Sequence, residues 1–221
     1  MHFGLEVWFF HHASLDHYSP KDKIDTWREK MRAIGIVGSP RKNGNTAFLV
    51  KEALEVLQQE RVDTELVHLQ GKEIKPCDGC LRCKKEMRCV IEGDSFEPIF
   101  QKLKKADGII LGSPVYFGSA TPQLMSLLDR AAYVRRQTKE YFSGKIGGPI
   151  VVARRAGHNF ALAQLLLWYF VNDMIVVGST YWNIGIAGSA GKRDIQADTE
   201  GIDTVRHFAK SMANLMKRLV G

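Results

Sequence analysis

The sequence predicts an α/β fold in which helices cover both faces of a five-stranded parallel sheet. Short apolar runs alternate with longer segments of helical periodicity along the chain, and this alternation is typical of parallel strands joined by helices. The chain has 221 residues, of which 45% are hydrophobic and 25% charged, as expected for one globular domain. Five strands suit the doubly wound order 2-1-3-4-5, whose ligand site lies at the carboxyl ends of the strands beside the switch point.

The elements follow in order along the chain. Apolar residues at helical spacing predict a helix after the loop that ends at residue 46, and Pro122, a residue favoured in a first turn, predicts where another begins. Further helices are expected over 96–106, 160–172 and 199–219. Short apolar runs predict strands over 33–37, 64–69, 108–112, 149–153 and 174–177.

Residues 1–30 differ from the rest of the chain. They hold four of the seven histidines, and Met31 stands directly before the first apolar run. We therefore expect an N-terminal arm or extension over 1–30, followed by one domain over 31–221 that includes a cysteine-rich segment at 77–89. The apolar stretch near the start lacks the basic residues and the cleavage site of a secretory signal, so we expect a cytoplasmic protein.

Charge and hydropathy exclude further classes of protein. The longest apolar run, 160–171, is shorter than the ~20 residues needed to span a bilayer, and we expect no membrane binding. The formal net charge is +7, which suits anionic ligands or acidic partners. No helix-turn-helix or RNA-binding signature accompanies that charge, so we do not expect nucleic acid as a partner.

The loop after the first predicted strand favours a phosphate site. It reads Gly-Ser-Pro-Arg-Lys-Asn-Gly-Asn-Thr over 38–46 and leads into a helix, whose N-terminal backbone N–H groups can bind an anion. It is neither a Walker loop nor the dinucleotide pattern Gly-x-Gly-x-x-Gly. A polar turn that only caps the helix is the alternative. The side-chain donors of the loop are Ser39, Arg41, Asn43, Asn45 and Thr46.

Two further loops are expected at the same edge of the sheet. The loop over 112–122 carries adjacent aromatic residues and a glycine, so it can hold a flat ring and donate main-chain N–H groups to it. A turn whose aromatic residues pack on the protein is the alternative. The loop over 153–159 would form a third wall, where His158 is either a neighbour of the ring or an ordinary loop histidine. Together the loops predict a mononucleotide that carries a flat heterocycle.

These loops resemble those of the flavodoxin-like NADPH-dependent FMN reductase superfamily. Gly-Ser-Pro-Arg-x-x-Gly-Asn-Thr and Ser-Pro-Val-Tyr-Phe-Gly carry the resemblance, which covers roughly 33–178. It implies FMN, with the phosphate on the donors of the first loop. The third loop departs from the Gly-Gly-Gln-Glu-like pattern of many reductases and reads Gly-His-Asn-Phe; Gly157 and His158 complete the candidate FMN contacts. The isoalloxazine is implied to lie against Pro114, Val115, Tyr116, Phe117 and Gly118.

All four cysteines fall within the segment 77–89, at Cys77, Cys80, Cys83 and Cys89. Clustered cysteines in a cytoplasmic protein more often bind metal or act in redox chemistry than form structural disulfides. The spacing is similar to ferredoxin-type [4Fe-4S] ligation, although there the last gap is three residues. A surplus of basic residues in and around the segment would offset the negative charge of a cluster. Structural zinc and free or redox-sensing thiols are the alternatives.

The cysteine spacing also resembles that of archaeal iron-sulfur flavoproteins, which combine one FMN and one [4Fe-4S] cluster per subunit. The resemblance implies a flavin-dependent oxidoreductase that takes electrons from a ferredoxin-like donor and passes them to a small-molecule acceptor such as O2, H2O2 or a quinone. The chemistry is carried by the two cofactors, and we expect no catalytic side chain. A homodimer or homotetramer is implied, with each cluster near a neighbouring flavin. Arg130, Arg135, Arg136 and Lys139 could steer an acidic ferredoxin or simply form a solvated helix face.

Two other functions remain open from the sequence. One is an NAD(P)H-dependent FMN or quinone reductase whose cysteines hold zinc or nothing. The other is a non-enzymatic electron carrier or redox sensor.

Overall fold

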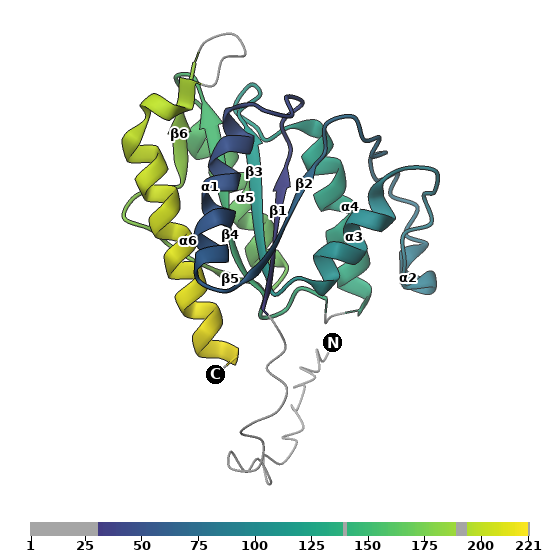
Figure 1. Ribbon diagram of the computed structural model, residues 1–221. Helices are drawn as coiled ribbons and strands as arrows, with labels where there is room; N and C mark the ends of the chain where they lie inside the picture. The colour runs from purple at the N-terminus through teal and green to yellow at the C-terminus, as the bar shows by residue number, and fades with distance from the viewer. Residues whose placement is uncertain (1–30, 139–140, 189–193, 221) are drawn as a thin grey trace, which may run out of the picture.

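The computed structural model describes residues 31–138, 141–188 and 194–220, so the predicted arm over 1–30 lies outside the described residues. The sheet has the order β2-β1-β3-β4-β5, and every pairing in it is parallel. This confirms the predicted flavodoxin-like order (Figure 1). The strands are β1 (Arg32–Val37), β2 (Asp63–His68), β3 (Gly108–Pro114), β4 (Ile146–Ala153), β5 (Ile175–Val176) and β6 (Ile184–Ile186).

Helices form a layer on each face of the sheet, as Figure 1 shows. Two separate clusters of buried apolar side chains result, one beneath α1 and α6 and the other beneath α3, α4 and α5. A short helix, α2, lies in the cysteine segment. The helices are α1 (Asn45–Gln59), α2 (Cys83–Glu86), α3 (Phe96–Lys105), α4 (Pro122–Thr138), α5 (His158–Val171) and α6 (Thr199–Val220), with a 3-10 helix η1 over Asp194–Ala197. None of the helices that the structure describes is long and apolar enough to cross a bilayer.

The last position of the sheet is shared by two short strands. β5 pairs with the start of β4, where Ile146 lies beside Ile175, and β6 pairs with its end, where Val151 lies beside Ile184. Sequence analysis missed β6 because three residues are too few to give a periodic pattern. β6 matters for the site, because it extends this edge of the sheet to the carboxyl end of β4.

The central strands bring three loops to one edge of the sheet. In β3 every residue up to the terminal Pro114 is buried, and β4 is buried along its whole length, because helices cover both faces. Val37 pairs with Gly112, and Gly112 with Ile150, so the loops after β1, β3 and β4 emerge side by side. A Cβ at Gly112 would lie 2.4 Å from Val50 Cγ2; the glycine thus lets α1 pack directly on β3 behind the loop that precedes the helix.

Candidate functional site

A cavity of about 240 Å³ lies at the carboxyl ends of β1, β3 and β4. Its walls come from the loops after these strands and from the segment after β6. The structure therefore brings together most of the residues predicted for FMN. Those that line the cavity are Ser39, Arg41, Asn45, Thr46, Pro114, Val115 and Tyr116, joined by Gly44, Val152, Ala153, Arg154, Ala187 and Gly188.

The first loop presents the uncapped start of α1 to this cavity. Ser39 Oγ accepts a hydrogen bond from the Arg41 N–H at 3.2 Å, and the Gly44 N–H donates to the Arg41 carbonyl at 3.1 Å. Gly44 is the N-cap of α1 and provides no side-chain cap, which leaves the first N–H groups of the helix without that partner. Such N–H groups and a guanidinium like that of Arg41 are donors of the kind that bind anions.

Asn45 lines the cavity and its side chain also bonds to the segment before α6. Its Nδ2 donates to Asp194 Oδ1 at 2.8 Å, and the Gly188 N–H donates to the other carboxylate oxygen at 2.7 Å. The Asn45 side chain thus joins the start of α1 to the segment before α6. Sequence analysis missed Asp194 and Gly188, because nothing local in the sequence signals a contact across 149 residues.

The loop after β3 contains a tight turn. The Val115 N–H donates to the Val152 carbonyl at 2.8 Å, which attaches the loop to β4. Tyr116 and Ser119 exchange backbone hydrogen bonds at 2.8 and 3.0 Å. Between them Phe117 and Gly118 have positive φ angles of 49° and 84°, and the Phe117 side chain is fully exposed. A non-glycine residue in this conformation is uncommon and often marks a functional loop.

Three predicted contacts lie behind or beside the cavity wall rather than on it. Asn43 is exposed on the turn before α1. Gly157 has φ +91°, and a Cβ there would lie 2.8 Å from Val115 Cγ1. His158 belongs to the first turn of α5, is buried, and donates from Nε2 to the Gly185 carbonyl of β6 at 3.1 Å. Their contact with FMN stays a prediction, as does that of Phe117 and Gly118.

Buried hydrogen bonds hold the first two loops together. Thr121 Oγ1 donates to the Gly38 carbonyl at 2.8 Å, and the Thr121 N–H donates to Ser113 Oγ at 3.0 Å. The Gly38 N–H donates to the Gly112 carbonyl at 2.8 Å. The phosphate loop and the loop after β3 are therefore fixed relative to one another, which sequence analysis did not foresee.

A second, small cavity of about 20 Å³ lies between the cysteine segment and α4. All four cysteines line it, together with Arg130, Tyr133 and Val134 of the helix. Within the described ranges, no three His, Cys, Asp or Glu side chains are already arranged as a ligand set for one metal ion. The four thiols thus line one cavity, but in the described ranges they are not arranged as the ligand set of one metal ion.

The backbone of the cysteine segment is a series of turns. Gly79, Leu81 and Met87 have φ angles of 70°, 55° and 56°, and the Cys80 N–H donates to Asp78 Oδ1 at 3.0 Å. Cys83 begins α2 and is the most deeply buried of the four. Burial raises the pKa of its thiol, and the neighbouring cysteine thiols add to that effect. Metal coordination would reverse it, because a coordinating thiol is deprotonated.

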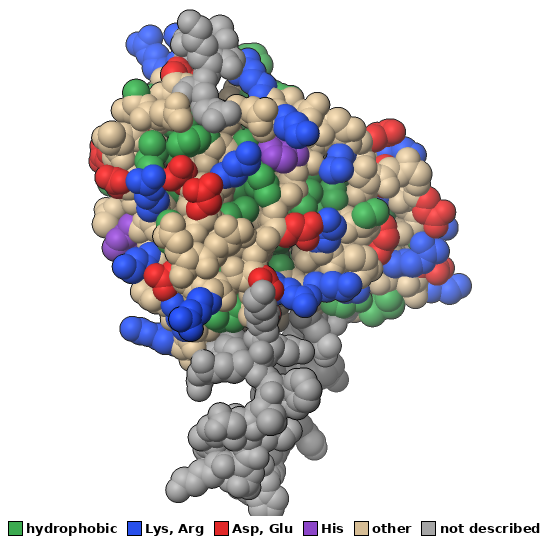
Figure 2. All heavy atoms as spheres, in the orientation of Figure 1, with side chains coloured by type: hydrophobic (Ala, Val, Ile, Leu, Met, Phe, Trp, Pro, Cys, Tyr) green, Lys and Arg blue, Asp and Glu red, His purple; other side chains and the backbone are tan. Residues whose placement is uncertain are grey.

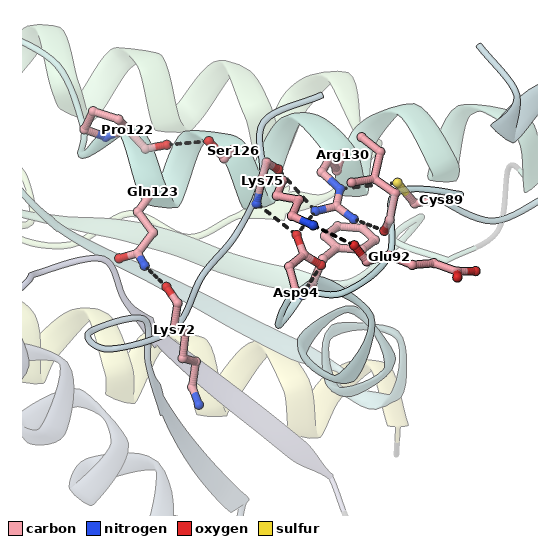
Figure 3. Close-up of polar contacts among 11 residues, drawn as sticks. Lys72, Lys75, Cys89, Glu92, Asp94, Pro122, Gln123, Ser126 and Arg130 are labelled. Atoms are coloured by element: carbon pink, nitrogen blue, oxygen red, sulfur yellow. Dashed lines mark hydrogen bonds and ion pairs between the residues drawn. The ribbon is translucent and has the colours of Figure 1, made fainter. Parts of the chain in front are cut away.

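Arg130 is not the surface residue that the charge pattern suggested. Its side chain is 0% exposed and lies beside Cys89 and Asp94 (Figure 3). Arg135 is 14% exposed and donates to the Val171 carbonyl at 3.4 Å, whereas Arg136 is exposed and Lys139 lies outside the described residues. Burial therefore contradicts, for Arg130, both the solvated helix face and the exposed charge that could steer an acidic ferredoxin. Figure 2 shows Lys and Arg side chains, interspersed with Asp and Glu, spread over the one face that it displays.

Comparisons with known proteins agree with this arrangement. Residues 31–189 match the family model described as NADPH-dependent FMN reductase. An iron-sulfur flavoprotein of Methanocaldococcus jannaschii is 40% identical over 194 residues, which cover 85% of this chain and 98% of that protein. One from Methanosarcina thermophila is 33% identical, with 85% and 96% covered.

Solved structures show the same fold at low identity. The protein RosB, crystallised with an 8-demethyl-8-formylriboflavin phosphate intermediate, superposes with a TM-score of 0.65 at 17% identity, covering 86% of this chain and 80% of that one. A WrbA-like flavodoxin from Agrobacterium tumefaciens gives 0.58 at 17% identity, with 86% and 99% covered. These structures show the fold, whereas the family model and the relatives show that the chain belongs to the NADPH-dependent FMN reductase family and to the iron-sulfur flavoproteins, and that it is a flavin-dependent oxidoreductase.

Proposed function

We propose that this chain binds FMN in the cavity at the strand ends and a [4Fe-4S] cluster at its four cysteines. In this proposal it passes electrons from a ferredoxin-like donor through the cluster to FMN, and from FMN to an acceptor such as O2, H2O2 or a quinone. The observation that carries the proposal is that Cys77, Cys80, Cys83 and Cys89 line one cavity, in a chain with a separate cavity of about 240 Å³ at the strand ends.

The residues of the larger cavity suit FMN. The N–H groups at the start of α1 and the Arg41 guanidinium would hold the phosphate, which is the chemistry a helix N-terminus favours. Arg154 adds a second positive charge from the loop after β4. Pro114, Val115 and Tyr116 supply an apolar wall for the ring.

The donor set of the smaller cavity suits a four-iron cluster. Four thiolates supply one ligand per iron. In addition, the matches to relatives named iron-sulfur flavoprotein cover nearly the full length of those relatives. The segment that carries the cysteines is exposed over Asp78–Arg82 and contains a glycine at positive φ.

Together the cofactors would supply conversion between one-electron and two-electron chemistry. No residue lines both cavities. Pro122 starts α4 beside the flavin loop, and Arg130 follows eight residues later, roughly 12 Å along the helix at 1.5 Å per residue. Within one chain, α4 thus separates the two sites, and electrons would have to cross that distance to reach FMN. In an oligomer, the cluster could instead pass electrons to the flavin of a neighbouring subunit.

We place the subunit contact of a homodimer or homotetramer on α5. The helix His158–Val171 contains no charged residue. Its outward side chains Phe160, Leu167 and Phe170 are 76%, 65% and 59% exposed. An apolar stripe of this length on the outside of a domain is typical of an interface, and a second copy of this chain is the occupant we propose.

Anaerobic purification followed by analysis of iron, sulfide, zinc and flavin tests the cofactors. We expect about four iron and four sulfide per chain, together with FMN. Zinc without iron would refute the cluster. Steady-state turnover with reduced ferredoxin and with NADPH then tests the electron donor.

The second candidate is an NAD(P)H-dependent FMN or quinone reductase with zinc or free thiols at the cysteines. One observation favours it, namely the match to the family model described as NADPH-dependent FMN reductase. Rapid NADPH oxidation that is indifferent to ferredoxin, in protein without iron, is the result that would select this function. A carrier or sensor would show reduction by either donor without turnover.

A further inference from the structure

We propose that Arg130 is a positioning residue for the cluster, which sets its reduction potential through a hydrogen bond to Cys89 and a buried ion pair with Asp94. This proposal rests on the proposed function, because it requires the cluster at the four cysteines.

Every donor nitrogen of the Arg130 guanidinium has a partner in the cysteine region (Figure 3). Nε donates to Cys89 Sγ at 3.3 Å. Nη2 donates to the Ile91 carbonyl at 2.8 Å, and Nη1 donates to the Lys75 carbonyl at 3.1 Å and to Asp94. The guanidinium carbon lies 4.0 Å above the centre of the Phe96 ring. Arg130 thus holds the chain on both sides of the four cysteines.

Asp94 is the only carboxylate paired with Arg130 among the described residues, and its side chain is 2% exposed. Its oxygens also accept the Lys75 N–H at 2.9 Å and the Phe96 N–H at 3.1 Å. Burial opposes its ionisation most strongly, but the hydrogen bonds from Arg130 and the two backbone N–H groups keep its pKa below the usual range. The pair is therefore ionic, and breaking it leaves a buried charge without a partner.

The position of the two charges relative to the sulfur predicts opposite effects on a cluster. Nε of Arg130 contacts the sulfur directly, whereas Asp94 contacts Nη1 on the far side of the guanidinium. One-electron reduction adds one negative charge to the cluster and its thiolates, and hydrogen bonds to the sulfurs together with nearby charge set the potential. Arg130 therefore favours the reduced cluster, and Asp94 opposes it.

The exposed basic residues of the segment provide a comparison. Arg88 precedes Cys89 in the sequence, and its side chain is 56% exposed and paired with Glu92 at 3.2 Å. Water and salt screen such a charge, while the charges of Arg130 and Asp94 act in a buried region of lower effective dielectric. A basic residue that is only close to a cysteine in the sequence is thus not expected to change the reduction potential of the cluster.

The test measures the midpoint potential of the cluster in full-length holoprotein, by dye-mediated titration with dithionite followed by electron paramagnetic resonance. The variants are Arg130→Gln, Arg130→Lys, Asp94→Asn and Arg88→Gln. We expect Arg130→Gln to move the potential to more negative values and Asp94→Asn to move it to more positive values. Arg130→Lys should shift it less than Arg130→Gln, and Arg88→Gln should leave it unchanged.

A purely structural role predicts a different pattern. Arg130→Gln and Asp94→Asn would then both lower the melting temperature and the iron content, and the cluster that remains would keep its potential. Unchanged potentials, or shifts of the same sign in the two variants, would overturn the proposal. If Arg130→Gln retains no iron, Asp94→Asn decides by itself, because only a positive shift agrees with the proposal. The iron content of the unaltered protein distinguishes failure of this proposal from failure of the proposed function. If the unaltered protein contains no iron, the proposed function itself is refuted.

Discussion

Thr121 and Gly38 join the two loops of the flavin cavity through one buried hydrogen bond. Thr121 Oγ1 donates to the Gly38 carbonyl at 2.8 Å, and both residues are buried. Gly38 directly follows β1 and Thr121 directly precedes α4, so the bond joins segments 83 residues apart. The position of the loop after β1, which we call the phosphate loop, relative to the loop after β3, which we call the ring loop, depends on contacts of this kind.

Replacing Thr121 by Val keeps the shape of the side chain and removes the hydroxyl. The Gly38 carbonyl then loses that buried partner, which lowers the free energy of unfolding by about 1–3 kcal/mol. Looser loops should also weaken FMN binding, by roughly tenfold for each 1.4 kcal/mol of affinity lost. Denaturant unfolding and flavin fluorescence titration measure the two effects. Ser126→Ala is the matched control, since the Ser126 hydroxyl donates to the Pro122 carbonyl within the same helix, and an equal loss there would contradict the prediction.

A methyl group at Gly157 should displace the ring loop. Its Cβ would lie 2.8 Å from Val115 Cγ1 and 3.2 Å from Gly118 Cα, at a φ of +91°. We expect Gly157→Ala to lower both the melting temperature and the affinity for FMN. Gly144→Ala separates the causes, because Gly144 has φ +74° with nothing near its Cβ. That variant carries the conformational cost of about 1–2 kcal/mol alone and should bind FMN normally.

We expect each cofactor site to lose its cofactor without affecting the other site. Cys83→Ala is expected to abolish iron binding and to leave FMN bound, because the sites share no lining residue. Arg41→Ala should do the reverse, since Arg41 lines the flavin cavity and does not line the cysteine cavity. Absorbance spectra and metal analysis of the two purified variants give the answer. Loss of both cofactors from either variant would show that the sites are coupled.

His68 should make the apoprotein less stable in acid. Burial lowers the pKa of its imidazole below 6.5, and Lys51 and Lys42 lower it further. Between this pKa and 6.5 the unfolded chain binds the proton more readily than the folded one, so stability falls as pH falls through that window. Thermal unfolding at pH 7.5 and at more acidic pH measures the loss. In His68→Gln the loss should be smaller, and an unchanged pH dependence would exclude His68 as its source.

A charge on the outer face of α5 tests the proposed subunit contact. Leu167→Glu places a carboxylate in the exposed apolar stripe, and we expect sedimentation to show a shift toward the monomer. The same charge at Asn214, exposed on α6 in the opposite layer, should leave the oligomer intact. Identical masses for both variants and the unaltered protein would rule out α5 as the interface.

The sequence by itself determined the fold class, the order of the strands and the family. Strands such as β3 and β4 are buried on both faces, so each reads as a continuous apolar run, and the residues after β1 and β3 carry the family's loop sequences. The clustering of the four cysteines is equally local. Such features are visible because each depends on residues that are neighbours in the chain.

Only the tertiary structure decided which side chains meet. Asn45 joins Asp194, His158 bonds to β6, and β6 itself is too short to give a pattern. Arg130 shows the difference most clearly, because in the sequence it belongs to a run of basic residues on a helix. Its burial against Asp94 and Cys89 follows from α4 packing on a segment 36–41 residues earlier. No periodicity within either segment encodes that contact.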